Sequence, residues 1–383
     1  MNRLLLAVSP GEIWAALVAQ GDLDALRLVR THGAAMPGDL YLGRVVALRP
    51  ELPAALVDIG EARPAFLGGE AIGRGIKLRE GEVIAVKVTK AARADKATGL
   101  TMKLHRDEQE VATAGNPPKL IRRRESALAS LIREFRADQV IIDDVASLAE
   151  AKRNFAGEVK VHLGHEPLFE AEGVAARIES AVAPRVALPI DGAISIDLTW
   201  AAILIDVDSG RAGAFAANLA AAAEIGRQIR LRDLSGPIVI DFVGMRERSQ
   251  RCRVETALKR ALGDEAQYLG WTRLGHFELV IKRRRPSLSE QLYERRVDAL
   301  GVRTPLTVAL EALRVLQRES RAAPGNRFGL RVHPEIAACL DRDAADARRE
   351  LEARLGYPIM VDAEPGARDS FALVPVHPIS SPS

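Results

Sequence analysis

The sequence has few cysteines and no long hydrophobic run, and these two absences exclude several classes of protein. Its 383 residues include two cysteines, Cys252 and Cys339, which lie far apart and in no C-x-x-C pair. This argues against a disulfide framework and against a cysteine-ligated zinc site. No uncharged apolar stretch approaches the length of about 20 residues that a transmembrane helix needs, so we expect no membrane partner. The apolar run at the N-terminus ends at Pro10 and Glu12, too soon for a signal-peptide core, so we expect a cytoplasmic protein.

The chain also lacks a strong excess of charge of either sign. It has 54 basic and 51 acidic residues, for a formal net charge of +3. Its 48% hydrophobic and 27% charged residues are typical of a globular protein, and its length allows two or three domains. A near-neutral total does not exclude a nucleic-acid partner, because a local basic patch supplies the attraction. Residues 122–124 and 282–285 are two such basic runs.

Alternating patterns of helix and strand predict an α/β protein with a barrel inserted into its first domain. The first 35 residues read as strand, helix and strand, with the helix over residues 11–20 (GEIWAALVAQ). Short β-rich segments separated by Gly, Pro and charged turns follow, a pattern typical of a five-stranded barrel of the OB type. The stretch from Glu108 to Leu120 reads as a loop. We expect four domains, over residues 1–36 with 105–183, then 37–104, 184–288 and 289–383.

Two apolar strands of the third predicted domain end in aspartate. AAILIDVDSG places Asp206 and Asp208 at the end of one strand, and PIVIDF places Asp241 at the end of the next. The helix between them returns the chain, so a right-handed crossover would make the strands parallel, and ligand sites gather beyond the carboxyl ends of such strands. Carboxylates meeting there would suit magnesium, which can activate a water for attack on a phosphodiester. The alternative is structural, because Asp also suits turns and helix caps.

Several segments of the chain closely resemble the ribonuclease E/G family. The segment RQIRLRDLSGPIVIDF (residues 227–242) is close to the family's signature, and DVDSGR and RLGHFELVIKRRRPSL also match its catalytic core. Residues 38–67 and 87–104 look like the family's inserted RNA-binding barrel. The resemblance implies an RNase H-like α/β domain with an inserted OB-type β-barrel, then a DNase I-like catalytic domain and a small C-terminal α/β domain. It also implies a metal-dependent endoribonuclease that hydrolyses single-stranded RNA in RNA processing or decay.

The resemblance also implies a metal site. Asp206 and Asp241 match the family's two metal-binding aspartates, so we expect them to carry catalysis with magnesium, or with manganese, which suits the same oxygen ligands. Asp208 stands where the family usually has Asn and adds a negative charge beside the metal, so we include it as a third candidate metal ligand.

The same resemblance implies contacts to single-stranded RNA, which is held by stacking on aromatics and by cations along the backbone. Leu56 replaces a second stacking aromatic of the family. The alternative for Phe66 is an ordinary position in the core of the barrel. The alternative for each basic residue is a surface charge that contacts only solvent. The candidate RNA-binding residues are Phe66, Lys90, Lys96, Lys282, Arg283 and Arg284.

The chain departs from the family in two further ways. The cysteine-containing zinc link expected after PSL is missing, so we expect no zinc and no homo-oligomer formed through such a link. The subdomain that senses a 5′-monophosphate is also missing, so we expect activity to depend little on the RNA 5′ end. These departures leave two other hypotheses open: a non-catalytic RNA-binding protein of the same superfamily, and a scaffold whose C-terminal unit binds protein partners.

Overall fold

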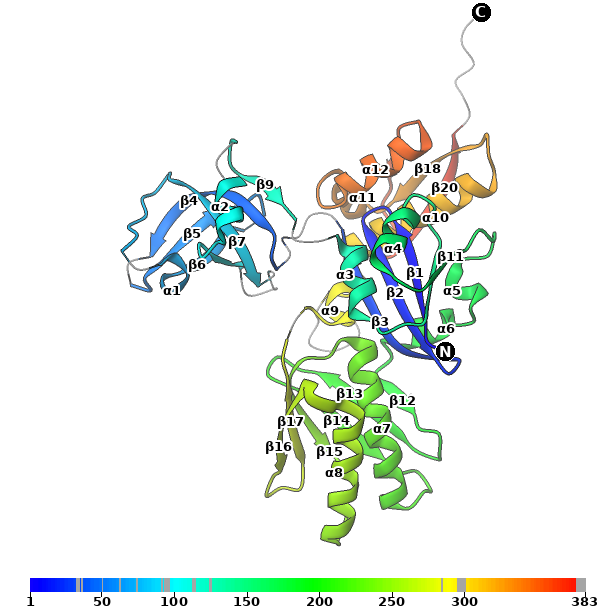
Figure 1. Ribbon diagram of the computed structural model, residues 1–383. Coiled ribbons are helices and arrows are strands. Elements are labelled where there is room, and N and C mark those ends of the chain that lie inside the picture. Colours follow the sequence, from blue (N-terminus) through cyan, green and yellow to red (C-terminus); the bar gives the residue numbers. More distant parts are fainter. Residues whose placement is uncertain are drawn as a thin grey trace, which may run out of the picture.

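The structure is a computed structural model, and it describes all residues except 32–34, 36, 50, 62, 74, 91, 93–96, 112–114, 124–125, 284, 295–300 and 377–383. The described residues form four β-sheets flanked by helices (Figure 1). This is the multi-domain, mixed α/β class that the sequence predicts. No helix among the described residues has both the length and the apolar character needed to cross a membrane.

The N-terminal sheet is mixed and is covered by helices on both faces. Its strands are β1 (Arg3–Ser9), β2 (Glu12–Ala19), β3 (Asp22–Arg30), β10 (Gln139–Ile142) and β11 (Glu158–Val161). Their order is β11-β10-β1-β2-β3, with β1 parallel to β10 and β10 parallel to β11. The helices of this part are α3 (Ala127–Glu134), α4 (Leu148–Asn154), α5 (Leu168–Ala171) and α6 (Ala175–Ser180). Helices α3 and α4 pack on one face of the sheet, and α5 and α6 pack on the other.

The prediction of a helix over residues 11–20 was wrong, because Glu12–Ala19 is the strand β2. It pairs antiparallel with both β1 and β3, and left-handed backbone at Gly11, Gln20 and Gly21 forms the turns on either side of it. Five of its eight residues are buried and the other three are half-buried. Side chains on one face of β2 join the core beneath α3 and α4, and those on the other face join the core beneath α5 and α6. A strand buried on both faces loses the alternation of apolar and polar residues, so its sequence resembles a buried helix.

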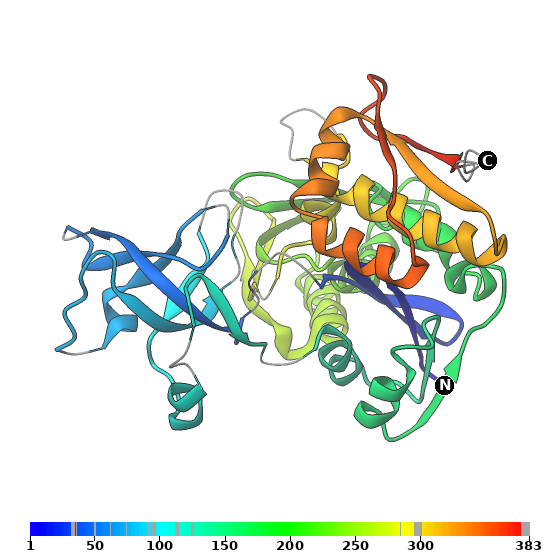
Figure 2. The same ribbon diagram turned by 90° about the horizontal axis from the view of Figure 1, so that it is seen from above.

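The inserted barrel is closed, as the sequence predicts. Its five strands are β4 (Leu40–Arg49), β5 (Ala54–Asp58), β6 (Ala65–Gly68), β7 (Val83–Lys90) and β8 (Gly99–Thr101). The order β5-β6-β8-β7-β4 closes because β4 pairs with β7 through its first half and with β5 through its second half. Helix α1 (Gly69–Ile72) follows β6. Figure 2 shows the barrel set to one side of the rest of the chain.

The stretch from Glu108 to Leu120, predicted as a loop, contains regular structure at both ends. Helix α2 (Arg106–Val111) includes its first residues, and strand β9 (Lys119–Arg122) includes its last. Strand β9 adds to the outer edge of β4. The prediction missed this strand because an edge strand is short and exposed on its outer side, so its sequence needs no regular pattern of apolar residues.

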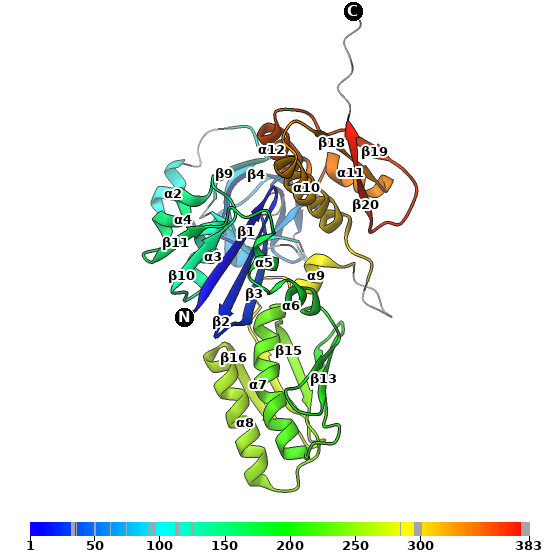
Figure 3. The same ribbon diagram turned by 90° about the vertical axis from the view of Figure 1, so that its right-hand side faces the viewer.

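The central sheet carries two long helices on one face. Its strands are β12 (Arg185–Ala187), β13 (Ala193–Leu198), β14 (Ile203–Asp208), β15 (Gly236–Asp241), β16 (Ala266–Trp271) and β17 (Phe277–Ile281), in the order β12-β13-β14-β15-β17-β16. The helices are α7 (Ala214–Arg232) and α8 (Arg248–Leu262), followed by the short η1 (Gly263–Glu265). Strands β14 and β15 are parallel, with α7 as the crossover between them. Figure 3 shows α7 and α8 side by side along the sheet.

The C-terminal unit is a small sheet with three helices. It contains α10 (Pro305–Ala322), β18 (Arg327–Val332), α11 (Pro334–Asp341), α12 (Ala345–Leu355), β19 (Val361–Ala363) and β20 (Phe371–Val376), and α9 (Leu288–Leu292) precedes it. The sheet order is β19-β18-β20. Helix α10 lies against the N-terminal sheet, where the Arg30 guanidinium donates to Thr307 Oγ1 at 2.9 Å.

A close approach of α7 and α8 fixes the helical layer of the central sheet. A Cβ atom built on Gly226 would lie 2.6 Å from Cβ of Ala261 and 3.2 Å from its carbonyl carbon. Backbone atoms cannot move aside as the end of a flexible side chain can, so this position on α7 requires glycine although glycine weakens a helix.

We therefore expect Gly226→Val to lower the free energy of unfolding by about 1–3 kcal/mol, because the added side chain overpacks the contact with Ala261. The matched control is Ala223→Val, one turn away on the exposed side of α7, which should cost less than about 1 kcal/mol. Urea unfolding of both variants measures the difference. Equal stabilities of the two variants would contradict this account of the packing.

Candidate active site

A row of polar residues crosses the central sheet at the carboxyl ends of β14 and β15. Asp206 lies directly opposite Asp241 on these neighbouring parallel strands. Ser195 is the partner of Asp206 on β13, and Arg185 is the partner of Ser195 on β12. On the other side, His276 Nε2 lies 3.9 Å from Asp241 Oδ2. Neighbouring strands are about 4.8 Å apart, so the two carboxylates stand side by side.

Alternation along the strands directs these side chains away from the helices. Ile205 and Ile240 are buried and belong to the core that contacts α7 and α8. Their neighbours Asp206 and Asp241 point to the opposite face and are exposed. Leu204 is 43% exposed on that same face, so the face is open to solvent. A polymer as wide as a nucleic-acid strand can therefore reach the two carboxylates.

Asp208 has both of its carboxylate oxygens occupied. Oδ1 accepts from the N–H of Gly210 at 2.9 Å, and Oδ2 accepts from Arg185 at 2.7 Å. These two interactions hold the pKa of Asp208 below its usual value. Arg211 pairs in the same way with Asp191 nearby, at 2.8 Å, and lowers the pKa of that carboxyl. The extra negative charge at position 208 is thus balanced by a neighbouring arginine.

The segment after Asp241 is held in place from inside the domain. Asn218 on α7 is fully buried, and its amide donates to the carbonyl oxygen of Val243 at 2.7 Å and accepts from the N–H of Val243 at 3.0 Å. Phe242 and Met245 are also buried. Asn218 therefore fixes the backbone two residues beyond Asp241 and, through it, the direction of that carboxylate.

The pair Asp206 and Asp241 fits a magnesium ion better than a zinc ion. Among the described residues, no three or more His, Cys, Asp or Glu side chains form a group that could enclose a metal ion. A closed site of protein ligands is therefore not present in that part of the chain. Magnesium is usually held by one or two carboxylates together with waters and substrate phosphate oxygens, and two adjacent exposed carboxylates supply that donor set.

The barrel brings together two of the predicted RNA-binding residues. Phe66 pairs with Leu56 on one side and with Gly99 on the other, and Gly99 pairs with Lys90. Phe66 is 40% exposed and Lys90 is exposed, so neither is a core residue. This row places an aromatic ring and an ammonium group on one outer face of the barrel. Lys96 lies outside the described residues.

The structure does not bring the basic run after β17 to the two carboxylates. Strand β17 is antiparallel to β15, so Lys282 and Arg283 lie at the opposite end of the sheet from Asp241. Arg283 donates to both carboxylate oxygens of Glu290, at 2.9 and 2.8 Å. Arg284 lies outside the described residues. Lys282 is exposed and free to meet a phosphate at that end of the sheet.

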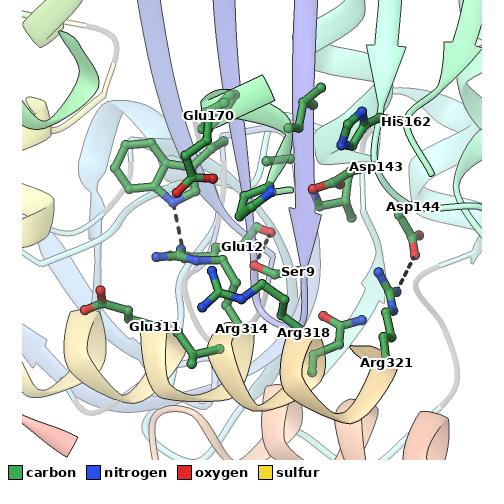
Figure 4. A pocket seen from close by; sticks show the side chains of 18 of the residues that line it. Ser9, Glu12, Asp143, Asp144, His162, Glu170, Glu311, Arg314, Arg318 and Arg321 are labelled. Atoms are coloured by element: carbon green, nitrogen blue, oxygen red, sulfur yellow. Dashed lines mark hydrogen bonds and ion pairs between the residues drawn. The ribbon is translucent and has the colours of Figure 1, made fainter. Parts of the chain in front are cut away.

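A second charged site, which the sequence did not indicate, lies between the N-terminal sheet and α10. It is a cavity of about 1190 Å³ beyond the carboxyl ends of β1, β10 and β11 (Figure 4). Arg314 of α10 pairs there with Glu12, and Arg354 of α12 lies 3.3 Å from Asp144. These two ion pairs join the C-terminal unit to the N-terminal sheet across the cavity.

Asp143 also lines this cavity, and among the described residues it forms no ion pair. Asp143 Oδ1 accepts from the N–H of Val8 at 2.7 Å. Burial, together with the nearby carboxylate of Asp144, raises the pKa of Asp143 to about 6, although the hydrogen bond from Val8 and the charge of Arg321 act in the opposite direction. Its charged form is therefore disfavoured in the folded protein.

Comparison with known proteins places the chain in one family. A profile described as the Ribonuclease E/G family matches residues 82–285, which is more than half of the chain. The chain therefore belongs to the ribonuclease E/G family, as the resemblance in the sequence indicated. The match includes the central sheet with Asp206 and Asp241 and the second half of the barrel.

Two curated relatives show how the chain compares with longer and shorter members. It is 27% identical to Ribonuclease E of Escherichia coli (strain K12) over 465 residues, which cover 92% of this chain and 44% of that protein. It is 26% identical to Ribonuclease G of Salmonella typhimurium (strain SL1344) over 474 aligned positions, which cover 95% of this chain and 97% of that protein. The chain thus spans about half of the Ribonuclease E relatives it matches. Both alignments are longer than 383 residues, so both relatives contain segments that this chain lacks.

The raised pKa of Asp143 predicts a pH-dependent penalty on folding. In the unfolded chain this carboxyl ionises near its usual pKa of about 4, whereas in the folded protein it ionises near about 6. Its contribution to stability is therefore full below about pH 4 and is lost as the pH rises through about 6. Asp143→Asn keeps the oxygen that accepts from Val8 and removes the ionisation, so its advantage over the native protein should grow from pH 4 to pH 6 and then stay constant, on the order of 2–3 kcal/mol.

Thermal unfolding between pH 4 and pH 8 measures this difference. Asp144→Asn is the contrasting variant, because it removes the buried partner of Arg354 and Arg321 and should be less stable than the native protein. A stability difference for Asp143→Asn that does not change with pH would contradict the assignment.

Proposed function

We propose that the chain is a metal-dependent endoribonuclease that hydrolyses phosphodiester bonds in single-stranded RNA. The observation that carries this proposal is the pairing of Asp206 with Asp241 at the ends of neighbouring parallel strands, on an open face of the sheet. Membership of the ribonuclease E/G family and relatives that are named ribonucleases support the same reaction.

Asp206 and Asp241 are the residues that would hold the ion, with magnesium or manganese suited to their oxygen donors. A divalent ion bound there would lower the pKa of a coordinated water and polarise a phosphodiester. Asp208 would reach the ion only by releasing Arg185, so we give it the role of setting the local charge rather than that of a third constant ligand. We propose no role for zinc.

The chain's own residues supply the remaining chemistry around the carboxylate pair. Arg185 is 60% exposed in its side chain and lies two strands from Asp206, where it can pair with an oxygen of the phosphate next to the one whose phosphorus is attacked. His276 stands beside Asp241 and is placed to accept or donate a proton at Nε2 during hydrolysis. Attack of water on phosphorus then forms one P–O bond and breaks the bond to the 3′ oxygen, which leaves a 5′-phosphate on the downstream product and a 3′-hydroxyl on the upstream one.

RNA binding is proposed to extend beyond the carboxylates onto the barrel. An exposed Phe66 offers a ring on which a base can stack, and Lys90 in the same row can pair with the adjoining phosphate. Leu56 beside Phe66 can make apolar contact with a base but cannot stack as an aromatic ring does. We keep Lys96, Lys282, Arg283 and Arg284 as proposed contacts, with Arg283 the weakest because Glu290 already binds it.

We also propose the four-domain division drawn from the sequence, a cytoplasmic location, and activity that depends little on the chemical state of the RNA 5′ end. The alignments that are longer than the chain support the last of these, because segments of the relatives are absent here. A homo-oligomer, if one forms, would use a contact other than a zinc link.

The first prediction concerns the two carboxylates. The native protein should cut a labelled single-stranded RNA internally when magnesium is present, and Asp206→Asn/Asp241→Asn should lower the rate at least about 100-fold, because the ion loses both ligands. The matched control is Asp197→Asn, which removes another exposed aspartate from the same face of β13, one row away, and should change the rate less than about threefold. The assay follows RNA fragments on a gel, with RNA affinity measured in parallel.

Three results would count against this proposal. Salt-sensitive RNA binding without cleavage by any of these proteins would favour a non-catalytic RNA-binding member of the family. Cleavage that survives in the double variant would place the reacting groups elsewhere. If none of these proteins binds RNA, RNA is not the partner and the scaffold hypothesis remains.

The second prediction concerns Asn218 as a positioning residue. Asn218→Ala removes both hydrogen bonds to Val243 and frees the segment after Asp241, so kcat should fall about tenfold or more while the affinity for RNA stays the same. The control is Gln228→Ala, a buried amide on the same helix whose partners Glu224 and Arg232 lie away from the site. Both variants should lose similar stability in thermal unfolding. An equal loss of kcat in both would show that Asn218 acts only through stability.

A further inference from the structure

The outer surface of α7 and α8 carries a groove that none of the proposed chemistry uses. It has a volume of about 720 Å³ and lies between the two helices, on the side away from the sheet. Asp206 and Asp241 point to the other face of that sheet, so the groove and the carboxylate pair lie on opposite sides of it. The residues that line the groove are Leu219, Ala223, Arg230, Arg253, Thr256, Ala257, Arg260 and Ala261.

The lining of the groove is cationic and contains no acidic residue. Three of its eight residues are arginines, and the other five are neutral. Small side chains form its floor, because the contact between Gly226 and Ala261 brings the helices together there. The guanidinium groups therefore stand along the sides of a shallow apolar channel. Helix α8 as a whole carries five basic residues, Arg248, Arg251, Arg253, Lys259 and Arg260, and one acidic residue, Glu255.

The three arginines are held to different degrees. Arg230 donates to the carbonyl oxygen of Ala261 at 2.7 Å and pairs with Asp24 at 2.8 Å, which fixes it at one end of the groove. Arg253 lies over the ring of Phe215, with its guanidinium carbon 4.8 Å from the ring centre. Arg260 is exposed, and within the described part of the chain it forms no ion pair or side-chain hydrogen bond. Two of the three can therefore bind an anion without breaking an existing ion pair.

We propose that this groove binds the phosphodiester backbone of RNA, at a site separate from the carboxylate pair. The charge of its lining complements a chain of phosphates, and arginine forms two parallel hydrogen bonds to a phosphate. The apolar floor can accept riboses or bases without discriminating among sequences. The stretch of α7 from Leu219 to Arg230 extends about 16 Å, so the groove follows a strand over more than one phosphate. This inference rests on the proposed function, because it takes RNA as the ligand.

The consequence is a second point of attachment for long substrates. An RNA that occupies only the open face meets Asp206 and Asp241 but not the arginines of the groove. A longer RNA can pass around the domain and bind both sides, which raises its affinity without altering the hydrolysis step. The groove should therefore distinguish long RNA from short RNA by affinity, and should leave kcat unchanged.

The test uses the full chain with Asp206→Asn/Asp241→Asn, so that the RNA stays intact. Affinities for a set of single-stranded RNAs of increasing length are measured by fluorescence anisotropy at several salt concentrations, with and without Arg253→Gln/Arg260→Gln. For long RNA, the groove variant should bind about tenfold more weakly, and the slope of log K against log salt should fall by about 1.4, since each phosphate contact on a single strand contributes about 0.7. For the shortest RNAs, affinity and slope should not change.

The matched control is Arg136→Gln/Arg342→Gln, which removes the same charge from two exposed arginines on other parts of the chain. It should keep the slope of its parent. In the protein that retains both aspartates, Arg253→Gln/Arg260→Gln should cut a short RNA with unchanged kcat, which excludes misfolding as the cause of weaker binding.

The outcomes separate this inference from the proposed function. If the protein that retains both aspartates cuts RNA, but Arg253→Gln/Arg260→Gln does not change the slope or the affinity for long RNA in the Asp206→Asn/Asp241→Asn protein, the groove inference is overturned and the endoribonuclease stands. An equal loss of slope in the control pair would also overturn it, because the effect would then follow net charge alone. If neither the protein that retains both aspartates nor the Asp206→Asn/Asp241→Asn protein binds RNA, both the inference and the proposed function fail.

Discussion

The parallel pairing of β14 with β15 is the constraint on which the rest of the account depends. It places Asp206 opposite Asp241, and a shift of the register by one residue would turn one of the two carboxylates into the helical layer. Helix α7 enforces this pairing, since it carries the chain back across the sheet and packs against α8 at Gly226. Asn218, on the first turns of the same helix, then fixes the segment that follows Asp241. One helix thus sets both the register and the direction of the site.

The two sides of the central sheet carry opposite charge. The open face has a pair of acidic groups that repel RNA unless a cation lies between them, and Arg185 and His276 stand on either side of this pair. The helical side presents arginines to solvent. We propose that a strand of RNA is attracted by the helical side and by the barrel, and that it meets the acidic pair only where a divalent ion neutralises the charge. In this proposal, the residues that hold the substrate are separate from those that cut it.

Local patterns in the sequence were enough to predict the barrel, the class of fold and the position of two aspartates at the ends of neighbouring parallel strands, whereas the metal-binding role of the aspartates stays a proposal. Each aspartate ends an apolar run, and the crossover rule relates the two runs without knowledge of the rest of the chain. Residues that reach the site through pairing across several strands could not be found in this way. Arg185 reaches the site because β12 pairs with β13, and β13 pairs with β14. His276 reaches it from the turn before β17. No local sequence pattern predicts either position. The family resemblance implied a role in metal binding for Asp206 and Asp241 and none for Arg185. His276 lies within a segment that matches the family, RLGHFELVIKRRRPSL, but a structural role for it was the preferred interpretation.

Two other features depended on packing that the sequence does not record. The strand β2 was mistaken for a helix because both of its faces are buried, which removes the period-two pattern. The cavity around Asp143 exists only because α10 and α12, far along the chain, pack against the ends of β1 and β10. Its paired acids and arginines come from segments that have no common motif. Long-range docking of this kind is where inference from sequence patterns ends.

The measurement that tests the central claim most directly is a crystal structure of the protein with bound manganese, located by its anomalous scattering. The account predicts one ion between Asp206 and Asp241, with an oxygen of each carboxylate within about 2.0–2.3 Å of it, and with Asp208 still paired to Arg185. An ion that binds away from both aspartates, or that touches neither of them at concentrations that support activity, would contradict the claim that these two residues form the metal site.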